Sequence, residues 1–180
     1  MIPAVSQTLA RILASQTSLE TVQQVSFDRP QRYQAQPVGV NLYAYDVRQT
    51  GAGGDLAEAE SGSVIADWAA VPDAVGQVEI SFLVVARDWT RLGEQQLLAE
   101  AIAYFAQHSE IPADRLVPAL QGCGSIAIEL ARPIDIVALW RALEVPLQPA
   151  LYLKVTVPTG ELTNGKPSVS SPVGIAPSRL

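Results

Sequence analysis

The segment from Gln77 to Arg87, QVEISFLVVAR, constrains the fold more than any other part of this chain. One face of an extended strand here carries the apolar side chains Val78, Ile80, Phe82 and Val84. Leu83 and Val85 begin to fill the opposite face. A strand that is apolar on both faces is typical of a buried position, so we expect a central strand in a sheet that is covered on both sides.

Four other segments have the side-chain alternation or β-branched content of strands: residues 22–27, 38–47, 125–131 and 151–157. The second of them places Tyr43 and Tyr45 on one face, where they need cover. The last follows Pro146 and Pro149, which end the preceding helix.

Three segments have helical periodicity. Residues 3–15 form an amphipathic pattern, and Pro133 begins another with Ile136, Leu139, Trp140 and Leu143 on one face. Asp88 and Thr90 offer N-caps for a longer helix, whose apolar stripe is Leu97, Leu98, Ala101, Ile102 and Phe105. The order of elements predicts an α/β (α+β) fold, a mixed β-sheet flanked by helices.

Two segments lack a sustained core face. Residues 48–76 are rich in glycine, alanine and acidic side chains, with Trp68 as one large apolar residue, and predict a long loop. Residues 159–180 repeat glycine, proline and serine, and predict a flexible C-terminal tail or extended arm. We therefore expect one domain over residues 1–158, since 180 residues with 48% hydrophobic content can bury a full core.

The inventory of reactive side chains argues against an enzyme. The chain has one histidine and one cysteine, so Cys123 between Gly122 and Gly124 has only His108 as a histidine partner. Asp46, Asp88 and Glu129 are candidate acid and base carboxylates, but the sequence does not bring them together. The acidic residues of the 48–76 loop match no calcium-loop spacing, and Gly51 to Gly54 lacks the ending of a phosphate loop. We expect no catalytic residues, no metal and no cofactor.

The charge and hydropathy patterns exclude other classes of partner. A formal net charge of −6 with 12 scattered Lys and Arg residues does not favour direct nucleic-acid binding. No segment approaches the roughly 18 apolar residues of a membrane span, so we expect no direct membrane insertion. A lone cysteine favours a reducing compartment, and the N-terminus lacks the basic region of a signal peptide; both indicate the cytoplasm.

The remaining candidates for function are contact residues. Trp140 falls on its helix's apolar stripe and is expected in the core, whereas Trp89, at a strand-to-helix corner, suits either the core or a subunit contact. Trp68 is a candidate for docking a neighbour. We also expect residues 151–157 to offer a strand edge to an extended arm of a sheath protein, with the candidate interface residues Leu151, Leu153, Val155 and Val157.

Four segments together carry a family resemblance: MIPAVSQTLARIL, VNLYAYDVR, SFLVVARDWTRLGEQQLLAEAI and LWRALEVPLQPALYLKVTVP. In this order and spacing, up to about Pro158, the chain resembles the tail-terminator or cap proteins of extracellular contractile injection systems, of the virulence-cassette and antifeeding-prophage type. The 48–76 loop and the C-terminal tail depart from some relatives.

The resemblance implies a non-enzymatic, structural role. In this family six copies form a ring at the end of the particle distal to the baseplate, where they cap the inner tube protein and engage the last layer of sheath protein. Two alternatives remain: a tail terminator or completion protein of a contractile phage, and a small-ligand-binding or Cys123-dependent domain. A tether to a membrane would run through another component of the particle.

Overall fold

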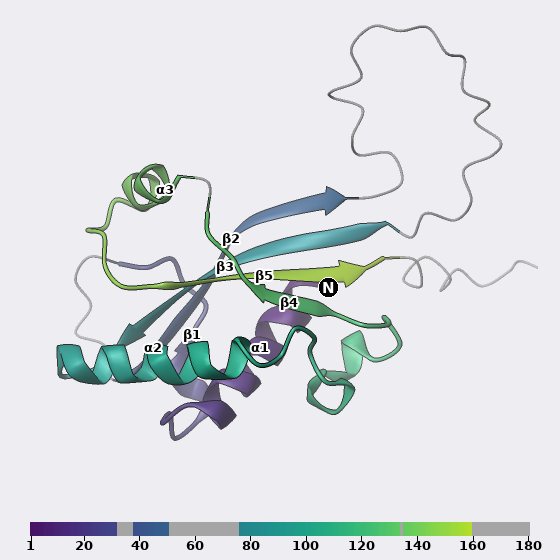
Figure 1. Cartoon of the computed structure of the whole chain (residues 1–180), viewed down its shortest axis with the longest axis horizontal. Helices are drawn as coiled ribbons and strands as arrows, with labels where there is room; N and C mark the ends of the chain where they lie inside the picture. Colours follow the sequence, from purple (N-terminus) through teal and green to yellow (C-terminus); the bar gives the residue numbers. More distant parts are fainter. Residues whose placement is uncertain (32–37, 51–75, 134, 160–180) are drawn as a thin grey trace, which may run out of the picture.

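The computed structural model describes residues 1–31, 38–50, 76–133 and 135–159. The centre of the fold is a five-stranded sheet in the order β1-β2-β3-β5-β4 (Figure 1). Its strands are β1 (Val25–Ser26), β2 (Gly39–Thr50), β3 (Gln77–Arg87), β4 (Ala127–Leu130) and β5 (Leu151–Pro158). Strand β1 is parallel to β2, and every other neighbouring pair is antiparallel.

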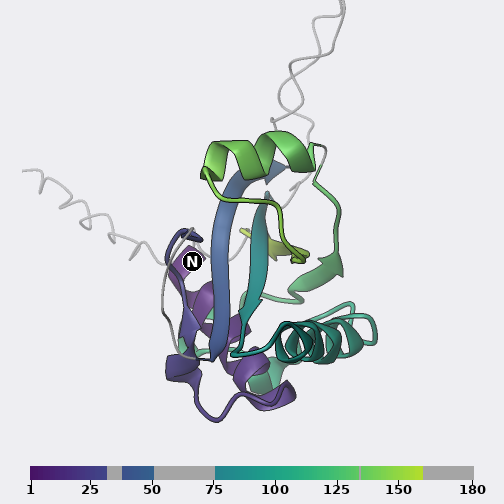
Figure 2. The same ribbon diagram turned by 90° about the vertical axis from the view of Figure 1, so that its left-hand side faces the viewer.

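Helices cover both faces of this sheet, as Figures 1 and 2 show. Helices α1 (Ile2–Gln16) and α2 (Arg91–Phe105) lie against one face, and α3 (Ile136–Leu143) lies over the other. The described residues also form three single turns of 3₁₀ helix: Val22–Gln24, Ala113–Arg115 and Pro118–Leu120. The mixed sheet flanked by helices is the architecture predicted from the sequence.

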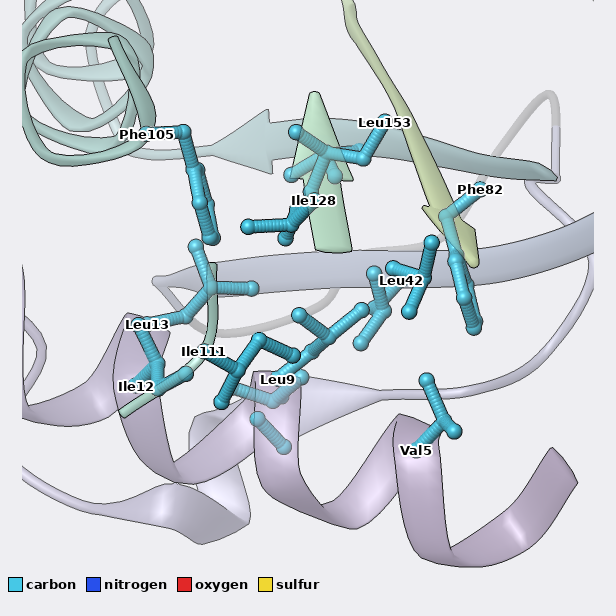
Figure 3. Close-up of a cluster of buried hydrophobic side chains, with 14 of the residues drawn as sticks. Val5, Leu9, Ile12, Leu13, Leu42, Phe82, Phe105, Ile111, Ile128 and Leu153 are labelled. Carbon is cyan, nitrogen blue, oxygen red and sulfur yellow. The ribbon is translucent and has the colours of Figure 1, made fainter. Parts of the chain in front are cut away.

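Strand β3 is the central strand, as its two apolar faces predict. It pairs with β2 along its whole length and with β5 on the other side. Ile80, Phe82 and Val84 belong to the larger core under α1 and α2, where Figure 3 shows α1 side chains directed toward Phe82 and Leu42. Leu83 and Val85 belong to a second core under α3. The β3 sequence therefore joins two separate hydrophobic layers.

The second core provides the cover that the β2 tyrosines require. Tyr43 and Tyr45 pack against the cluster that contains Trp140, which is 2% exposed and lies in the core as expected. The Trp140 indole N–H donates a hydrogen bond of 2.8 Å to the Tyr152 hydroxyl on β5. A buried indole N–H needs such an acceptor, so this contact fixes α3 over the sheet.

The helix caps and apolar stripes agree with the sequence in one of three details. The Thr90 hydroxyl accepts from the Gly93 N–H at 3.0 Å, as predicted for the start of α2. Helix α3 begins at Ile136, after an Asp135 cap that accepts from the Ala138 N–H at 2.8 Å, and not at Pro133. Ile102 was expected in the α2 stripe but is 43% exposed, because the buried stripe runs through Leu97, Leu98, Ala101 and Phe105.

Three strand boundaries differ from the prediction. Residues 22–27 give one 3₁₀ turn and a two-residue strand, because the Gln24 side chain accepts from the N–H groups of Glu20 and Thr21 and closes a turn. Strand β2 continues through Arg48 to Thr50, where a loop was expected to begin, because it keeps pairing with β3 as far as Gln77. Strand β4 is shorter than residues 125–131. The rest of the 48–76 loop and the 160–180 tail lie outside the described residues.

Candidate assembly surfaces

The most exposed aromatic side chain among the described residues is Trp89, in the corner between β3 and α2. It is 83% exposed, so it does not belong to the core. The residues on either side of it are held by local bonds, because the Asp88 carboxylate accepts from the Thr90 N–H at 2.9 Å. Trp89 is thus displayed on an ordered turn, which lowers the entropy cost of using it in a contact.

Two leucines are also exposed on neighbouring elements. Leu92 is 76% exposed on the first turn of α2, and Leu147 is 64% exposed on the elbow between α3 and β5. Leu147 and Arg91 line a common hollow of about 310 Å³. The elbow and the start of α2 lie at the same end of the molecule (Figure 1). We call Trp89, Leu92 and Leu147 the corner surface.

The predicted β5 interface is wrong in its geometry. Leu151, Leu153, Val155 and Val157 are at most 6% exposed and contribute to the larger core. Strand β5 is not an edge over residues 153–156 either, because β4 pairs with it there. These four side chains stabilise the folded subunit and do not form a contact surface on it. Trp68, the other candidate, lies outside the described residues.

The sheet face beyond α3 is polar and carries charges of both signs. A hollow of about 620 Å³ is lined there by the carboxylates of Asp46, Glu79, Glu129 and Asp135 and by the cations of Arg48, Arg132 and Lys154. The Lys154 ammonium lies 2.7 Å from Glu129 and 3.6 Å from Glu79. The hydrogen bond to Glu129 raises the pKa of Lys154, because the carboxylate stabilises the charged ammonium.

The candidate acid and base carboxylates have structural partners. Asp46 pairs with Arg48 at 2.7 Å, and Asp88 supports the α2 corner. Asp46 and Glu129 share the polar hollow, while Asp88 is not part of it. Within the described residues, no group of three or more His, Cys, Asp or Glu side chains is arranged to hold a metal ion.

Cys123 and His108 do not form a catalytic pair in the described chain. The Cys123 thiol is buried, 6% exposed, in a turn in which Gly122 and Gly124 have φ values of 88° and 78°. His108 stacks on Tyr104 with ring centroids 4.2 Å apart, and its Nδ1 lies 2.8 Å from the Tyr104 carbonyl. The histidine lies beyond the end of α2 at Phe105, and the cysteine packs in the core. A helix both long and apolar enough to cross a membrane is not found in the described part of the chain.

Comparison with known families decides the relationship. The family model of the Pvc16 N-terminal domain matches residues 4–172. The chain belongs to this family. The resemblance stated from the sequence segments is therefore confirmed. A search of curated proteins gave no match.

Solved structures show the same fold. The sheath/tube terminator of an extracellular contractile injection system, PVC, in its extended state, matches with a TM-score of 0.58 and 16% identity over 100% of this chain. The tube-terminating cap of the anti-feeding prophage matches with a TM-score of 0.54 and 17% identity over 98% of it. This family member spans 63% and 60% of the lengths of those two chains.

Proposed function

We propose that this chain is a structural terminator of a phage-tail-like contractile injection particle, with contacts to tube and sheath proteins and to further copies of itself. The observation that carries the proposal is the family match over residues 4–172 together with a fold shared, over nearly the whole chain, with two tube terminators. A terminator acts through contact surfaces and needs no catalytic pocket.

The surfaces of the subunit support this role. The corner surface presents three large apolar side chains, each more than 60% exposed, on ordered backbone. Contact energy in protein interfaces is concentrated in such large side chains, with Trp prominent among them. A ring requires the surface of one subunit to meet a different surface of the next, and one apolar end on each subunit suits such a contact.

The contractile-phage terminator uses the same ring geometry and is the second candidate. Both solved relatives belong to injection particles, which favours the injection-system assignment. A Cys123-dependent enzyme has less support, because the thiol is buried and the one histidine is bonded to the Tyr104 carbonyl in the last turn of α2.

Light scattering over a concentration series tests the assembly. We expect the 19.2 kDa chain to form a species of about six copies, alone or with tube and sheath proteins. Negative-stain images of this species would show closed rings. A chain that stays monomeric at every concentration, with both partners present, would contradict the proposed function.

A further inference from the structure

Strand β2 has a long unpaired edge in the described part of the chain. On one side it pairs with β3 from Gly39 to Thr50. On the other side β1 pairs with it only at Val40 and Asn41. Figure 2 shows β2 as the strand on the outer side of β3. The N–H and C=O groups of residues 42–50 that point away from β3 are therefore available to another strand.

The opposite edge of the sheet, formed by β4, is partly covered. The Ile111 N–H donates to the Ile126 carbonyl at 2.9 Å, and the Ile128 N–H donates to the Ser109 carbonyl at 2.9 Å. The segment before β4 thus covers part of the outer edge of β4. Among the described strands, the β2 edge is the long side left open to strand addition.

The side chains at this edge also lack cover. Val47 is 46% exposed, although Ile80, its cross-strand partner on β3, is 0% exposed. The hydrophobic cover of this face therefore ends between β3 and the outer part of β2. The two charged side chains of this strand, Asp46 and Arg48, follow a bulge after Ala44 and are paired with each other at 2.7 Å. An added strand with an apolar residue beside Val47 would extend the core.

A segment of this chain has the pattern that such a strand requires. In residues 168–176, SVSSPVGIA, the odd positions carry Val169, Val173 and Ile175, and the even positions are small or proline. Proline is accepted in an edge strand when its nitrogen faces solvent. In an extended strand the N–H groups of odd-numbered and even-numbered residues point to opposite sides. Because Pro172 is even-numbered, the N–H groups of the odd-numbered residues are free to face β2. Pro167 and Pro177 are odd-numbered, so they lack the N–H group that would face β2, and they mark the two ends of the segment.

The position of the chain end favours donation to another copy. The Thr159 N–H donates to the Gly76 carbonyl at 2.7 Å, so the tail leaves the sheet beside the start of β3. Residues 51–75 join β2 to β3 at this same end. To reach its own β2 edge the tail would have to cross that connection, and connections at one end of a sheet rarely cross.

We propose that residues 168–176 of one copy add a strand to the β2 edge, residues 42–50, of a neighbouring copy. The eight residues between Thr159 and Ser168 let the extended chain span about 30 Å from one to the other. The contact is head-to-tail, because donor and acceptor are different surfaces, and it therefore suits a closed ring. This inference rests on the proposed function, since it needs an assembly of several copies.

Cysteine cross-linking in the full-length chain tests the pairing. All variants carry Cys123→Ala, so that the introduced thiols are the only ones. A size-tagged chain with Val47→Cys is mixed with untagged chains that carry one cysteine, at Val169, Ser171, Val173 or Ile175. We expect a disulfide-linked mixed dimer for at least one tail position, because paired strands bring Cα atoms within the roughly 4.4–6.8 Å that a disulfide spans. Gln107→Cys, exposed after the end of α2, is the control.

Two outcomes of the cross-linking would overturn the inference. One is a yield at every tail position no higher than that of the Gln107→Cys control. The other is a chain carrying both cysteines that forms only an internal disulfide, since its tail would then cover its own edge.

Proline substitutions at two neighbouring serines test whether the proposed pairing contributes to assembly, one as the test and the other as its control. Ser171→Pro removes an N–H that faces β2 in the proposed pairing, whereas Ser170→Pro removes one that faces solvent. We expect Ser171→Pro, and deletion of residues 160–180, to raise the concentration needed for assembly about tenfold, since several cross-strand pairs are lost. Ser170→Pro is expected to assemble as the unmodified chain does.

The assembly results separate this inference from the proposed function. Rings that form at the original concentration after tail deletion would overturn strand donation and leave the terminator role intact. If the unmodified chain forms no oligomer even with tube and sheath proteins, both the proposed function and the inference fail.

Discussion

At the scale of single residues, Glu100 joins the end of α1 to α2. Its carboxylate accepts hydrogen bonds from the Ser18 N–H at 2.6 Å, the Ser18 hydroxyl at 3.0 Å and the Gln96 amide at 2.9 Å. The Gln96 bond, followed by the Ser18 bonds, lowers the pKa of Glu100 below its ordinary value, and burial acts in the opposite direction.

Replacing this carboxylate has a pH-dependent cost. A lowered folded pKa means that the ionised form stabilises the protein above the ordinary carboxyl pKa, and that this stability is lost as pH falls through the folded pKa. We expect Glu100→Gln to lower the free energy of unfolding by about 1 kcal/mol at pH 7, as measured in urea. The difference between variant and unmodified protein should shrink toward pH 3. A difference that is the same at both pH values would contradict this account, and the exposed Glu20→Gln is the control.

Tyr152 tests the buried polar contact of the second core. Tyr152→Phe leaves the Trp140 N–H without its acceptor in a site where the indole is 2% exposed. We expect a loss of about 1–3 kcal/mol in the free energy of unfolding, since a buried donor loses its partner. The loss should be smaller in a Trp140→Phe background, where there is no donor left to satisfy. Equal losses in both backgrounds would show that the hydrogen bond is not the cause; Tyr43→Phe is the control.

At the scale of elements, the corner between β3 and α2 carries the main prediction about contacts. Trp89→Ser removes a side chain that is 83% exposed. The free energy of unfolding should therefore change by no more than about 0.5 kcal/mol. We expect assembly to need about tenfold more protein or higher, the loss typical of a central interface residue. Ile102→Ser, on an exposed position near the other end of α2, should alter neither quantity. Equal assembly by both variants would exclude the corner surface as a contact.

Most elements were predictable because local pattern and burial agree. The apolar residues on both faces of β3 indicated a central strand. Thr90 indicated the start of α2, and the apolar stripe around Trp140 indicated the buried face of α3. The failures arise where a contact that the alternation does not show decides the structure, either with another strand or with a nearby side chain. Leu151 to Val157 alternates as an edge strand would, but β4 pairs with it and makes it internal. Residues 22–27 alternate as well, but the Gln24 side chain closes a turn there.

The candidate site was less predictable than the fold. Trp89 was identified as a contact candidate from its place at a corner, but the sequence alone also allowed a core position. Leu147 gave no clear signal, because its exposure depends on how the elbow between α3 and β5 turns back toward α2. The open edge of β2 depends on the shortness of β1, which no local pattern indicates.

At the scale of the whole molecule, the order of four segments along the chain indicated the family, and the family match confirms that relationship. The sheet face beyond α3 carries charges of both signs, the Cys123 thiol is buried, and Trp89 is exposed at the corner between β3 and α2.

The most direct test is to locate the chain on intact particles by immunogold electron microscopy with an epitope-tagged copy. The account predicts label at one end of each particle, on the side away from the baseplate, and particles of irregular length when the chain is deleted. Label distributed along the sheath, or particles of unchanged length and closed ends without the chain, would contradict a terminator role.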